Sequence, residues 1–214
     1  MRKPVFITGP EAAAMIRDNS TIATIGMTLV SASETILKAI ENSFLETGSP
    51  CGLTLVHSCG QSDQDRGIQH FSHEGMLAGI IGGHWGLQPK MMQLISENKI
   101  FAYNLPQGQF AQLYRSMAGG EPGKITKVGL GTFIDPRMGG GKMNQRTRSM
   151  PDIVDVVTID GKEYMRYKPI PLDYCIIRGT YVDELGNLTT DEEAMQLEVI
   201  SAVLACKKFG GKVI

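Results

Sequence analysis

The sequence predicts an α/β fold with an open, mainly parallel sheet, helices on both faces and a β-hairpin in the second half. Two observations carry this prediction. In the first 120 residues, short β-branched and aliphatic runs alternate with longer stretches whose apolar residues recur at helical spacing. Such alternation favours a parallel sheet that is covered on both faces. Beyond residue 150, two strand-like runs flank Asp160-Gly161, which is a typical hairpin turn.

Four short runs in the first half predict buried strands. They lie at 21–25, 53–57, 78–81 and 100–103. Aliphatic, aromatic and β-branched residues dominate these runs, and each run has the length of a strand rather than of a helix. We therefore expect the four runs to lie in one sheet.

Three helices are expected among and after these strands. Residues 31–34 (Ser-Ala-Ser-Glu) have the spacing of a capping box, which predicts that the first helix begins there. A second helix is expected over 88–97. A third carries Phe110 and Tyr114 on its apolar face and ends at Gly119-Gly120, because glycine readily takes the conformation that closes a helix.

The second half has a different pattern. A hairpin is expected over 153–168, a strand over 174–177 and a polar turn over 183–187. Residues 190–193 (Thr-Asp-Glu-Glu) have capping-box spacing again and predict the start of a last helix. Gly210-Gly211 would end that helix.

Residues 1–214 are expected to form a single domain, without internal repeats, low-complexity tracts or linkers. After the last helix come residues 212–214 (Lys-Val-Ile), which favour a strand where the alternation requires one. Chain ends are more often polar and poorly ordered. We therefore expect that more chain, or a partner, continues the sheet beyond this point.

Composition excludes several classes of protein. Hydrophobic residues make up 42% and charged residues 20% of the chain, which is typical of a globular domain. A net charge of -1 gives no basic stripe for nucleic acid, and no apolar run approaches the roughly 20 residues of a membrane span. The start lacks the apolar stretch of a signal peptide. Four cysteines without paired spacing indicate a reducing compartment, so we expect a cytoplasmic location; they are Cys51, Cys59, Cys175 and Cys206.

Histidine and cysteine are concentrated in one stretch, at His57, Cys59, His70, His73 and His84. Zinc could use such side chains. The spacing fits no standard zinc site, however. Packed or capped imidazoles are therefore the favoured interpretation, and we predict no metal.

Three familiar site motifs are incomplete. The run 129–131 (Gly-Leu-Gly) lacks the third glycine of a dinucleotide fingerprint, because residue 134 is Ile. Gly141-Lys142 lacks the first glycine of a P-loop and is followed by Met143. No Gly-x-Ser-x-Gly elbow is present for an acyl-serine mechanism.

Five other motifs, in order and with their spacing, carry a resemblance over the whole chain. They lie at 73–75, 83–85, 103–108, 131–144 and 177–187. Together they resemble the N-terminal (α-type) half of family I CoA-transferases, and within that family the acetate/propionate type. Membership would imply exchange of CoA between short-chain acyl-CoA and carboxylic acids, with coenzyme A as a substrate and no other cofactor.

The resemblance also implies the route of the reaction. A glutamate attacks the thioester, and a glutamyl-CoA thioester follows. In the family this glutamate lies in the C-terminal half, in a Glu-x-Gly context, and we expect it to be absent from this chain. Glu121 and Glu184 each precede a residue and a glycine, but no apolar strand leads into them. Neither is expected to be the nucleophile, so the chain alone should be inactive.

Gln107 and Gly108 are the first candidate substrate-binding residues. Gln107 resembles the family glutamine that faces the reacting carboxylates, and an amide there can donate to a developing oxyanion. Local chemistry alone leaves an alternative open, since a polar residue before a helix can simply be a cap.

Two further segments complete the candidate site. Gly26 and Met27 follow the first strand, at the edge where open α/β sheets bind ligands; a plain strand–helix turn is the alternative. Gly139, Gly140 and Gly141 could let the backbone close over the acyl group, or could form a flexible surface loop.

A second function remains open from sequence, because the same architecture also serves non-catalytic ligand-binding and regulatory modules. For the enzyme, the expected partners are the C-terminal half and further copies of the protein in a homo-oligomer, in addition to CoA and short acids. We expect neither nucleic acid nor a membrane as a partner.

Overall fold

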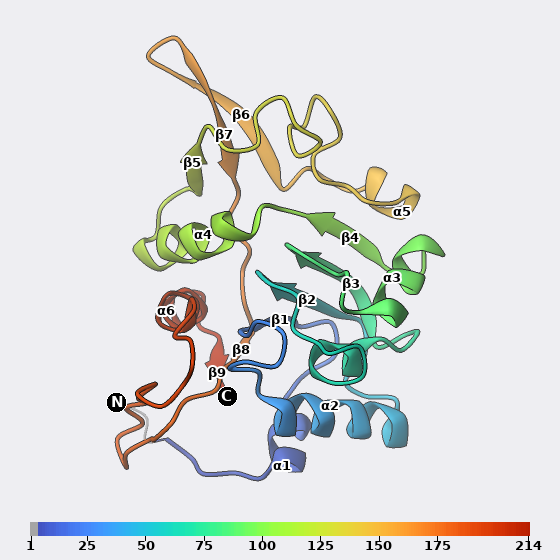
Figure 1. Cartoon of the computed structure of the whole chain (residues 1–214), viewed down its shortest axis with the longest axis vertical. Helices are drawn as coiled ribbons and strands as arrows, with labels where there is room; N and C mark the ends of the chain where they lie inside the picture. Colours follow the sequence, from blue (N-terminus) through green and yellow to red (C-terminus); the bar gives the residue numbers. More distant parts are fainter. Residues whose placement is uncertain (1–3) are drawn as a thin grey trace.

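Six parallel strands form the main sheet. In the computed structural model, which describes residues 4–214, they run in the order β4-β3-β2-β1-β8-β9. Their bounds are Phe101–Asn104 (β4), Leu77–Gly82 (β3), Leu53–His57 (β2), Thr21–Thr24 (β1), Tyr174–Ile176 (β8) and Lys212–Val213 (β9). The predicted strands and their common sheet are confirmed (Figure 1).

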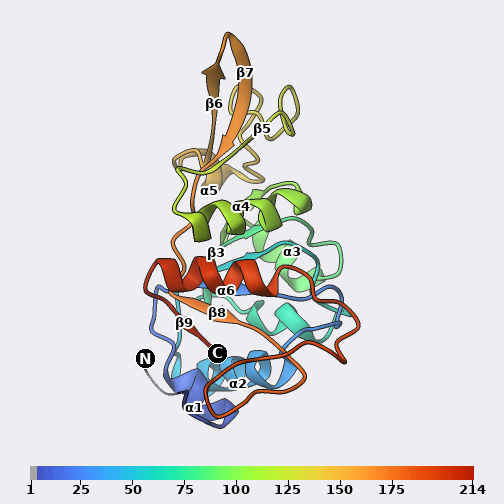
Figure 2. The same ribbon diagram turned by 90° about the vertical axis from the view of Figure 1, so that its left-hand side faces the viewer.

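Helices cover both faces of this sheet, as predicted. They are α1 (Gly9–Ala14), α2 (Glu34–Thr47), the 3-10 helix η1 (Gly67–Phe71), α3 (Pro89–Ser96), α4 (Gln107–Gly119), α5 (Gln145–Arg148) and α6 (Val199–Lys208). Figure 2 looks onto α4 and α6, which lie side by side in front of the sheet. The helices α1, α2, α3 and η1 pack on the opposite face.

Side-chain alternation along the central strands separates two apolar cores. Ile22 and Leu55 face the core beneath α2 and α3. Their neighbours Ala23 and Val56 face the core beneath α4 and α6. Successive side chains of a strand point to opposite faces. Strands buried on both sides are therefore apolar throughout, which is what the sequence shows.

A smaller antiparallel sheet extends from one end of the molecule (Figures 1 and 2). It has the order β5-β7-β6, with bounds Lys124–Thr126 (β5), Val154–Ile159 (β6) and Lys162–Tyr167 (β7). The predicted hairpin turn is confirmed: Asp160 and Gly161 have φ of 49° and 72°. Two residues with positive φ form the turn that best matches strand twist.

The first predicted capping box is wrong in detail. The helix α2 begins at Glu34, with Ser33 as its N-cap, and Ser31 has a φ of 57°. In a capping box the serine oxygen would accept from a helix amide, whereas the Ser31 hydroxyl donates to the Met195 carbonyl at 2.9 Å. A contact distant in sequence has therefore replaced the local cap.

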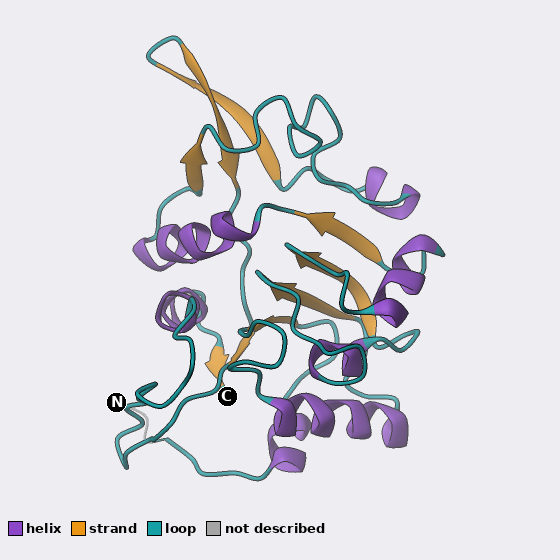
Figure 3. Ribbon diagram, in the orientation of Figure 1, coloured by secondary structure: helices purple, strands orange, loops and turns teal. Residues whose placement is uncertain are grey.

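The second predicted capping box is also wrong. Residues 190–198 are irregular and α6 begins only at Val199, with Glu198 at its N-cap. The Glu193 carboxylate accepts from Arg178 Nε at 3.0 Å, which takes it away from a capping position. Figure 3 shows the two long loop segments that result, 127–144 and 177–198. No helix in the described part of the chain has the length and apolarity needed to cross a membrane.

Candidate functional site

The candidate site lies where the central strands end. The turn Ser58–Gly60 follows β2, Gly83 follows β3 and Gln107 follows β4. Because parallel strands end at the same edge of a sheet, these segments meet there. A Cβ atom added to Gly83 would lie 2.2 Å from the Ser58 carbonyl oxygen and 3.2 Å from Gln107 Cα. The three backbones are therefore in close contact, and only glycine fits at residue 83.

Gln107 is exposed and begins α4, but it does not cap that helix. The N-cap is Pro106, and no side chain makes the capping hydrogen bond. Gln107 instead packs beside the end of β3, where a Cβ added to Gly83 would lie 3.2 Å from its Cα and 3.3 Å from its Cβ. The capping alternative is therefore wrong, and the amide belongs to the edge of the sheet. Gly108 beside it is also exposed, and an added Cβ would meet no atom within 4 Å.

Gly26 and Met27 form a tight turn after β1. Gly26 is buried, and a Cβ added to it would lie 3.2 Å from the Val30 carbonyl oxygen. Met27 and Val30 exchange backbone hydrogen bonds of 3.0 and 2.9 Å. The amide of Thr28 then donates to the Gly60 carbonyl at 2.7 Å. This bond joins the loop after β1, which carries Gly26 and Met27, to the turn after β2.

Glu198 is a site residue that the sequence prediction missed. Its carboxylate, at the N-cap of α6, accepts a short hydrogen bond from the Ser58 hydroxyl. Burial raises the pKa of the Glu198 carboxyl, and the bond from Ser58 only partly offsets this. A signal was available, because an acid stands between Leu197 and Val199 in an apolar run.

The Cys59 thiol lies between these groups. Burial raises the pKa of the Cys59 thiol most, the backbone amide of Gly60 opposes this effect, and the negative charge of Glu198 raises the pKa further. The thiol form is therefore favoured over the thiolate at neutral pH. Nothing in the described surroundings of Cys59 activates it as a nucleophile.

A pair of buried ring nitrogens lies behind the turn. His57 Nδ1 is 2.7 Å from the Cys59 carbonyl oxygen, and burial lowers the pKa of His57 to about 4. Within residues 4–214, His57 Nε2 and Trp85 Nε1 have no hydrogen-bond partner. A Cβ added to Gly82 would lie 2.4 and 2.7 Å from these two atoms. His57 is thus a neutral, packed imidazole.

His84 lies at the same turn, where a Cβ added to Gly60 would lie 2.6 Å from His84 Nδ1, whereas His70 and His73 lie elsewhere. His70 contacts Glu41 Oε2 through Nδ1 at 2.5 Å and Glu34 Oε1 through Nε2 at 2.8 Å. His73 Nε2 contacts Glu41 Oε1 at 2.7 Å. These contacts support the interpretation of packed imidazoles. Over residues 4–214, no three His, Cys, Asp or Glu side chains are arranged so that they could hold a metal ion.

The triple glycine lies against the outer edge of β4. The amide of Gly141 donates to the Phe133 carbonyl at 3.0 Å, and its own carbonyl accepts from the Asn104 amide at 2.8 Å. All three glycines have positive φ. Gly141 is therefore bonded on both sides, to the 131–138 loop and to the end of β4. Gly139 lines a cavity of about 670 Å³. A second cavity, beside Glu198, shares no lining residue with it.

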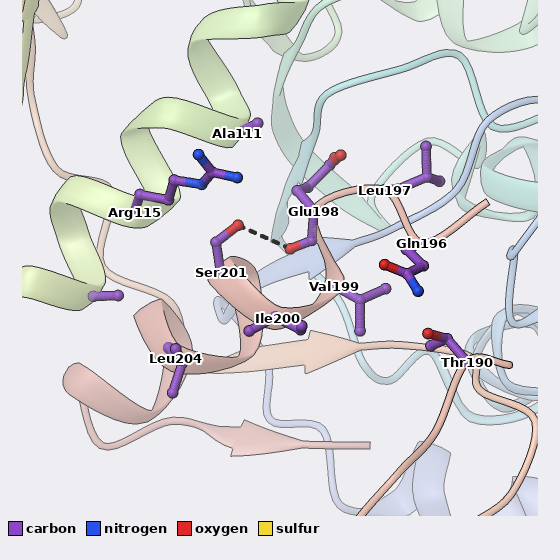
Figure 4. Close-up of a pocket in the computed structure, with 11 residues that line it drawn as sticks. Ala111, Arg115, Thr190, Gln196, Leu197, Glu198, Val199, Ile200, Ser201 and Leu204 are labelled. Carbon is purple, nitrogen blue, oxygen red and sulfur yellow. Dashed lines mark hydrogen bonds between the residues drawn. The ribbon is translucent and has the colours of Figure 1, made fainter.

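The cavity beside Glu198 lies between α4 and α6 and has a volume of about 410 Å³ (Figure 4). Arg115 extends from α4 toward α6, and the Ser201 hydroxyl donates to the Glu198 carbonyl at 3.0 Å. The other walls are largely apolar, including Leu204. The cavity can therefore take an apolar group and offers one guanidinium to an anion.

Glu121 and Glu184, the two glutamates that stand two positions before a glycine, are both exposed, in turns.

The sequence model of the family described as Coenzyme A transferase matches residues 8–207. This chain belongs to the coenzyme A transferase family. It is 40% identical over 210 residues to "Caffeate CoA-transferase" of Acetobacterium woodii. This alignment covers 98% of this chain and 40% of that protein. Over 203 residues it is 26% identical to "Acetate CoA-transferase subunit alpha" of Escherichia coli, covering 95% and 82%.

A solved structure gives the same answer for the fold. The apoenzyme of the acyl-CoA transferase YdiF from Escherichia coli O157:H7 matches with a TM-score of 0.94 and 36% identity, over 99% of this chain and 41% of that one. The chain thus spans about 40% of the length of the first relatives. The transferase chain corresponds to the N-terminal, α-type half of family I, as its motifs indicated.

Proposed function

We propose that the protein to which this chain belongs transfers CoA between a short-chain acyl-CoA and a carboxylic acid. The observation that carries the proposal is the match along nearly the whole chain to acyl-CoA and acetate CoA-transferases. Acetate and propionate are the acids we expect. The relative named for caffeate makes a larger aromatic acid the alternative acceptor.

In this proposal a glutamate of the second half is the nucleophile. Its carboxylate attacks the thioester carbonyl, so that a C–O bond forms, the C–S bond breaks and CoA thiolate leaves. The thiolate attacks the glutamyl carbonyl of the anhydride and releases the first acid. The second acid then reverses these steps on the glutamyl-CoA thioester. Coenzyme A is a substrate throughout, and the scheme needs no resident cofactor.

This chain would supply one wall of the site. The exposed amide of Gln107 donates to the oxyanion or orients a carboxylate. Gly108 leaves open space beside it, where an added Cβ would meet nothing. Met27 is half-buried after Gly26 and offers an apolar surface at the same edge. Gly139, Gly140 and Gly141 would let the backbone close over the acyl group from beside β4, where the Gly141 carbonyl accepts from the Asn104 amide.

The second half is the proposed partner, and two features support it. The caffeate CoA-transferase and the acetate CoA-transferase YdiF are more than twice as long as this chain, which covers 40% of the length of each. The outer side of α6 leaves Ile200 74% and Leu204 51% exposed. Apolar surface of this kind is usually covered by another protein surface. We propose further that the protein is a cytoplasmic homo-oligomer, which the four free cysteines suit.

Transfer assays test the proposal. The 214-residue chain, alone and with the second half, is incubated with acetyl-CoA and either propionate or caffeate, and the new acyl-CoA is followed by chromatography. We expect turnover on the order of 1–1000 per second with the second half, and none with the chain alone. No transfer from acetyl-CoA to propionate or caffeate in the complete protein would favour the non-catalytic module. Turnover by the chain alone would mean that the nucleophile lies within it.

A further inference from the structure

We propose that Glu198 is a positioning residue that holds the turn Ser58–Gly60 in place and thereby keeps Gln107 aligned in the candidate site. The inference deepens the proposed function and rests on it for its kinetic consequence. Its structural part stands on contacts within this chain. The bond between Glu198 and Ser58 joins α6 to the end of β2, across 140 positions of sequence.

The turn Ser58–Gly60 connects the separate parts of the site. Its Gly60 carbonyl accepts from the Thr28 amide, which ties it to the loop after β1. Its Ser58 carbonyl packs against Gly83, which also contacts Gln107: a Cβ added to Gly83 would lie 2.2 Å from the Ser58 carbonyl oxygen and 3.2 Å from Gln107 Cα. Its Ser58 side chain is 3% exposed and binds Glu198. A displacement of this turn would therefore move the Gln107 amide and the first loop together.

Glu198 is itself held firmly. The irregular segment before it crosses the same edge of the sheet and is attached twice. Ser31 Oγ donates to the Met195 carbonyl at 2.9 Å, and Arg178 Nε donates to Glu193 at 3.0 Å. The amide of Ala202 then donates to the Glu198 carbonyl at 2.9 Å in the first turn of α6. The carboxylate thus reaches Ser58 from a fixed backbone.

The environment of the carboxylate argues against a purely stabilising role. Burial disfavours the charge, and the Glu198 carboxylate forms no ion pair within the described residues. A half-buried acid without a cation contributes little to stability, and an apolar side chain of the same size would do as well. The hydrogen bond from Ser58 is the contact through which Glu198 holds the turn Ser58–Gly60 in place.

Alkylation of Cys59 tests the structural part without any transfer activity. Iodoacetamide labelling of the full-length protein is followed by peptide mass spectrometry, which separates Cys59 from Cys51. In Glu198→Ala and in Ser58→Ala, loss of a hydrogen bond to a charged group should raise the Cys59 labelling rate about tenfold. The double variant should equal either single one, because both lose the same bond.

Three comparisons serve as controls for the Cys59 labelling experiment. Glu198→Gln keeps an acceptor for Ser58 and should restore most of the slow labelling. Glu192→Ala is the matched control, because Glu192 is an exposed acid of the same segment that binds only the Tyr181 hydroxyl at 2.9 Å; it should leave Cys59 unchanged. The Cys51 rate should stay constant throughout.

Kinetics of the complete protein test the rest. Glu198→Ala should lower kcat about tenfold with little change in KM, and Glu198→Gln should recover it. Equal labelling of Glu198→Gln and Glu198→Ala with no effect of Ser58→Ala would reduce the role to charge and overturn the inference. A parallel rise in the labelling rate of Cys51 would also overturn the inference, because it indicates unfolding. If the wild-type protein transfers no CoA, the proposed function fails, while the labelling result still decides the positioning role.

Discussion

The turn after β2 and the helix pair α2–η1 both hold buried polar side chains, yet the two groups differ in how their polar atoms are satisfied. In the first group, His57 Nε2 has no partner within the described residues, and the Glu198 carboxylate accepts from the Ser58 hydroxyl. In the second, Glu41 accepts from both His70 and His73. The second group is therefore a paired structural clamp, whereas the first leaves a buried polar atom without a partner.

Electrostatics point the same way. Burial alone would raise the pKa of Glu41, but hydrogen bonds from His73 and His70 outweigh burial and hold that pKa below its usual value. Glu198 has no such compensation, and its pKa is raised. A protein that only needed stability would pair its buried charges, as the clamp does.

The largest expected effect concerns Gln107. In the complete protein, Gln107→Ala should lower kcat about 100- to 1000-fold, the usual loss for one oxyanion donor. Its free energy of unfolding should change by less than about 1 kcal/mol, because Gln107 is exposed and caps nothing. Steady-state kinetics and urea unfolding measure the two quantities. Gln112→Ala on the same helix is the control. Activity near wild type would remove Gln107 from the site.

His57 should give stability a distinctive pH dependence. Its pKa is about 4 in the folded protein and 6.5 when unfolded. The unfolded state thus binds the proton first, so stability falls as pH drops from about 6.5 to about 4, by about 3 kcal/mol. In His57→Asn this part of the pH profile should be flat. His84→Asn should keep most of the wild-type slope, because the charge of His84 is the smallest of the causes that set the pKa of His57. An unchanged slope in His57→Asn would contradict the buried neutral imidazole.

Glu41 should matter to folding and not to chemistry. Glu41→Gln removes a carboxylate shared by two histidines and should cost about 2 kcal/mol of unfolding free energy at pH 7. Because the folded pKa is lowered, this contribution is present above about pH 4.5 and is lost as pH falls further. Denaturant unfolding at several pH values measures it, with the exposed Glu46→Gln as control. A loss of kcat in the folded variant would make the clamp part of the site.

Tyr114 gives the smallest expected effect. Its buried hydroxyl has no partner among the described residues. Tyr114→Phe should therefore change stability by less than about 0.5 kcal/mol. Tyr103→Phe loses the bond from the hydroxyl to the Pro151 carbonyl at 2.7 Å and should cost about 1 kcal/mol. Thermal unfolding of both variants measures the difference. Equal costs would mean that Tyr114 has a partner after all.

Sequence by itself determined the sheet, most helices and the family. Apolar runs and helical spacing report burial directly, so β1, β2, β3 and β4 and the hairpin could be predicted to within one residue at each end. Five motifs indicated the family, whose sequence model matches residues 8–207. Gln107 was also found from its motif, although only the structure excluded a cap.

Tertiary structure alone decided which polar groups meet. Ser31 and Glu193 carried local capping signals, yet their side chains bind partners far away in sequence, as with the Met195 carbonyl 164 positions from Ser31. Glu198 and Ser58 likewise carry no sequence pattern that joins them. The triple glycine, which the sequence placed with Gln107, lies on the other edge of β4. Apolar burial follows from each segment's own periodicity, whereas a polar side chain takes the partner that the completed fold brings within reach.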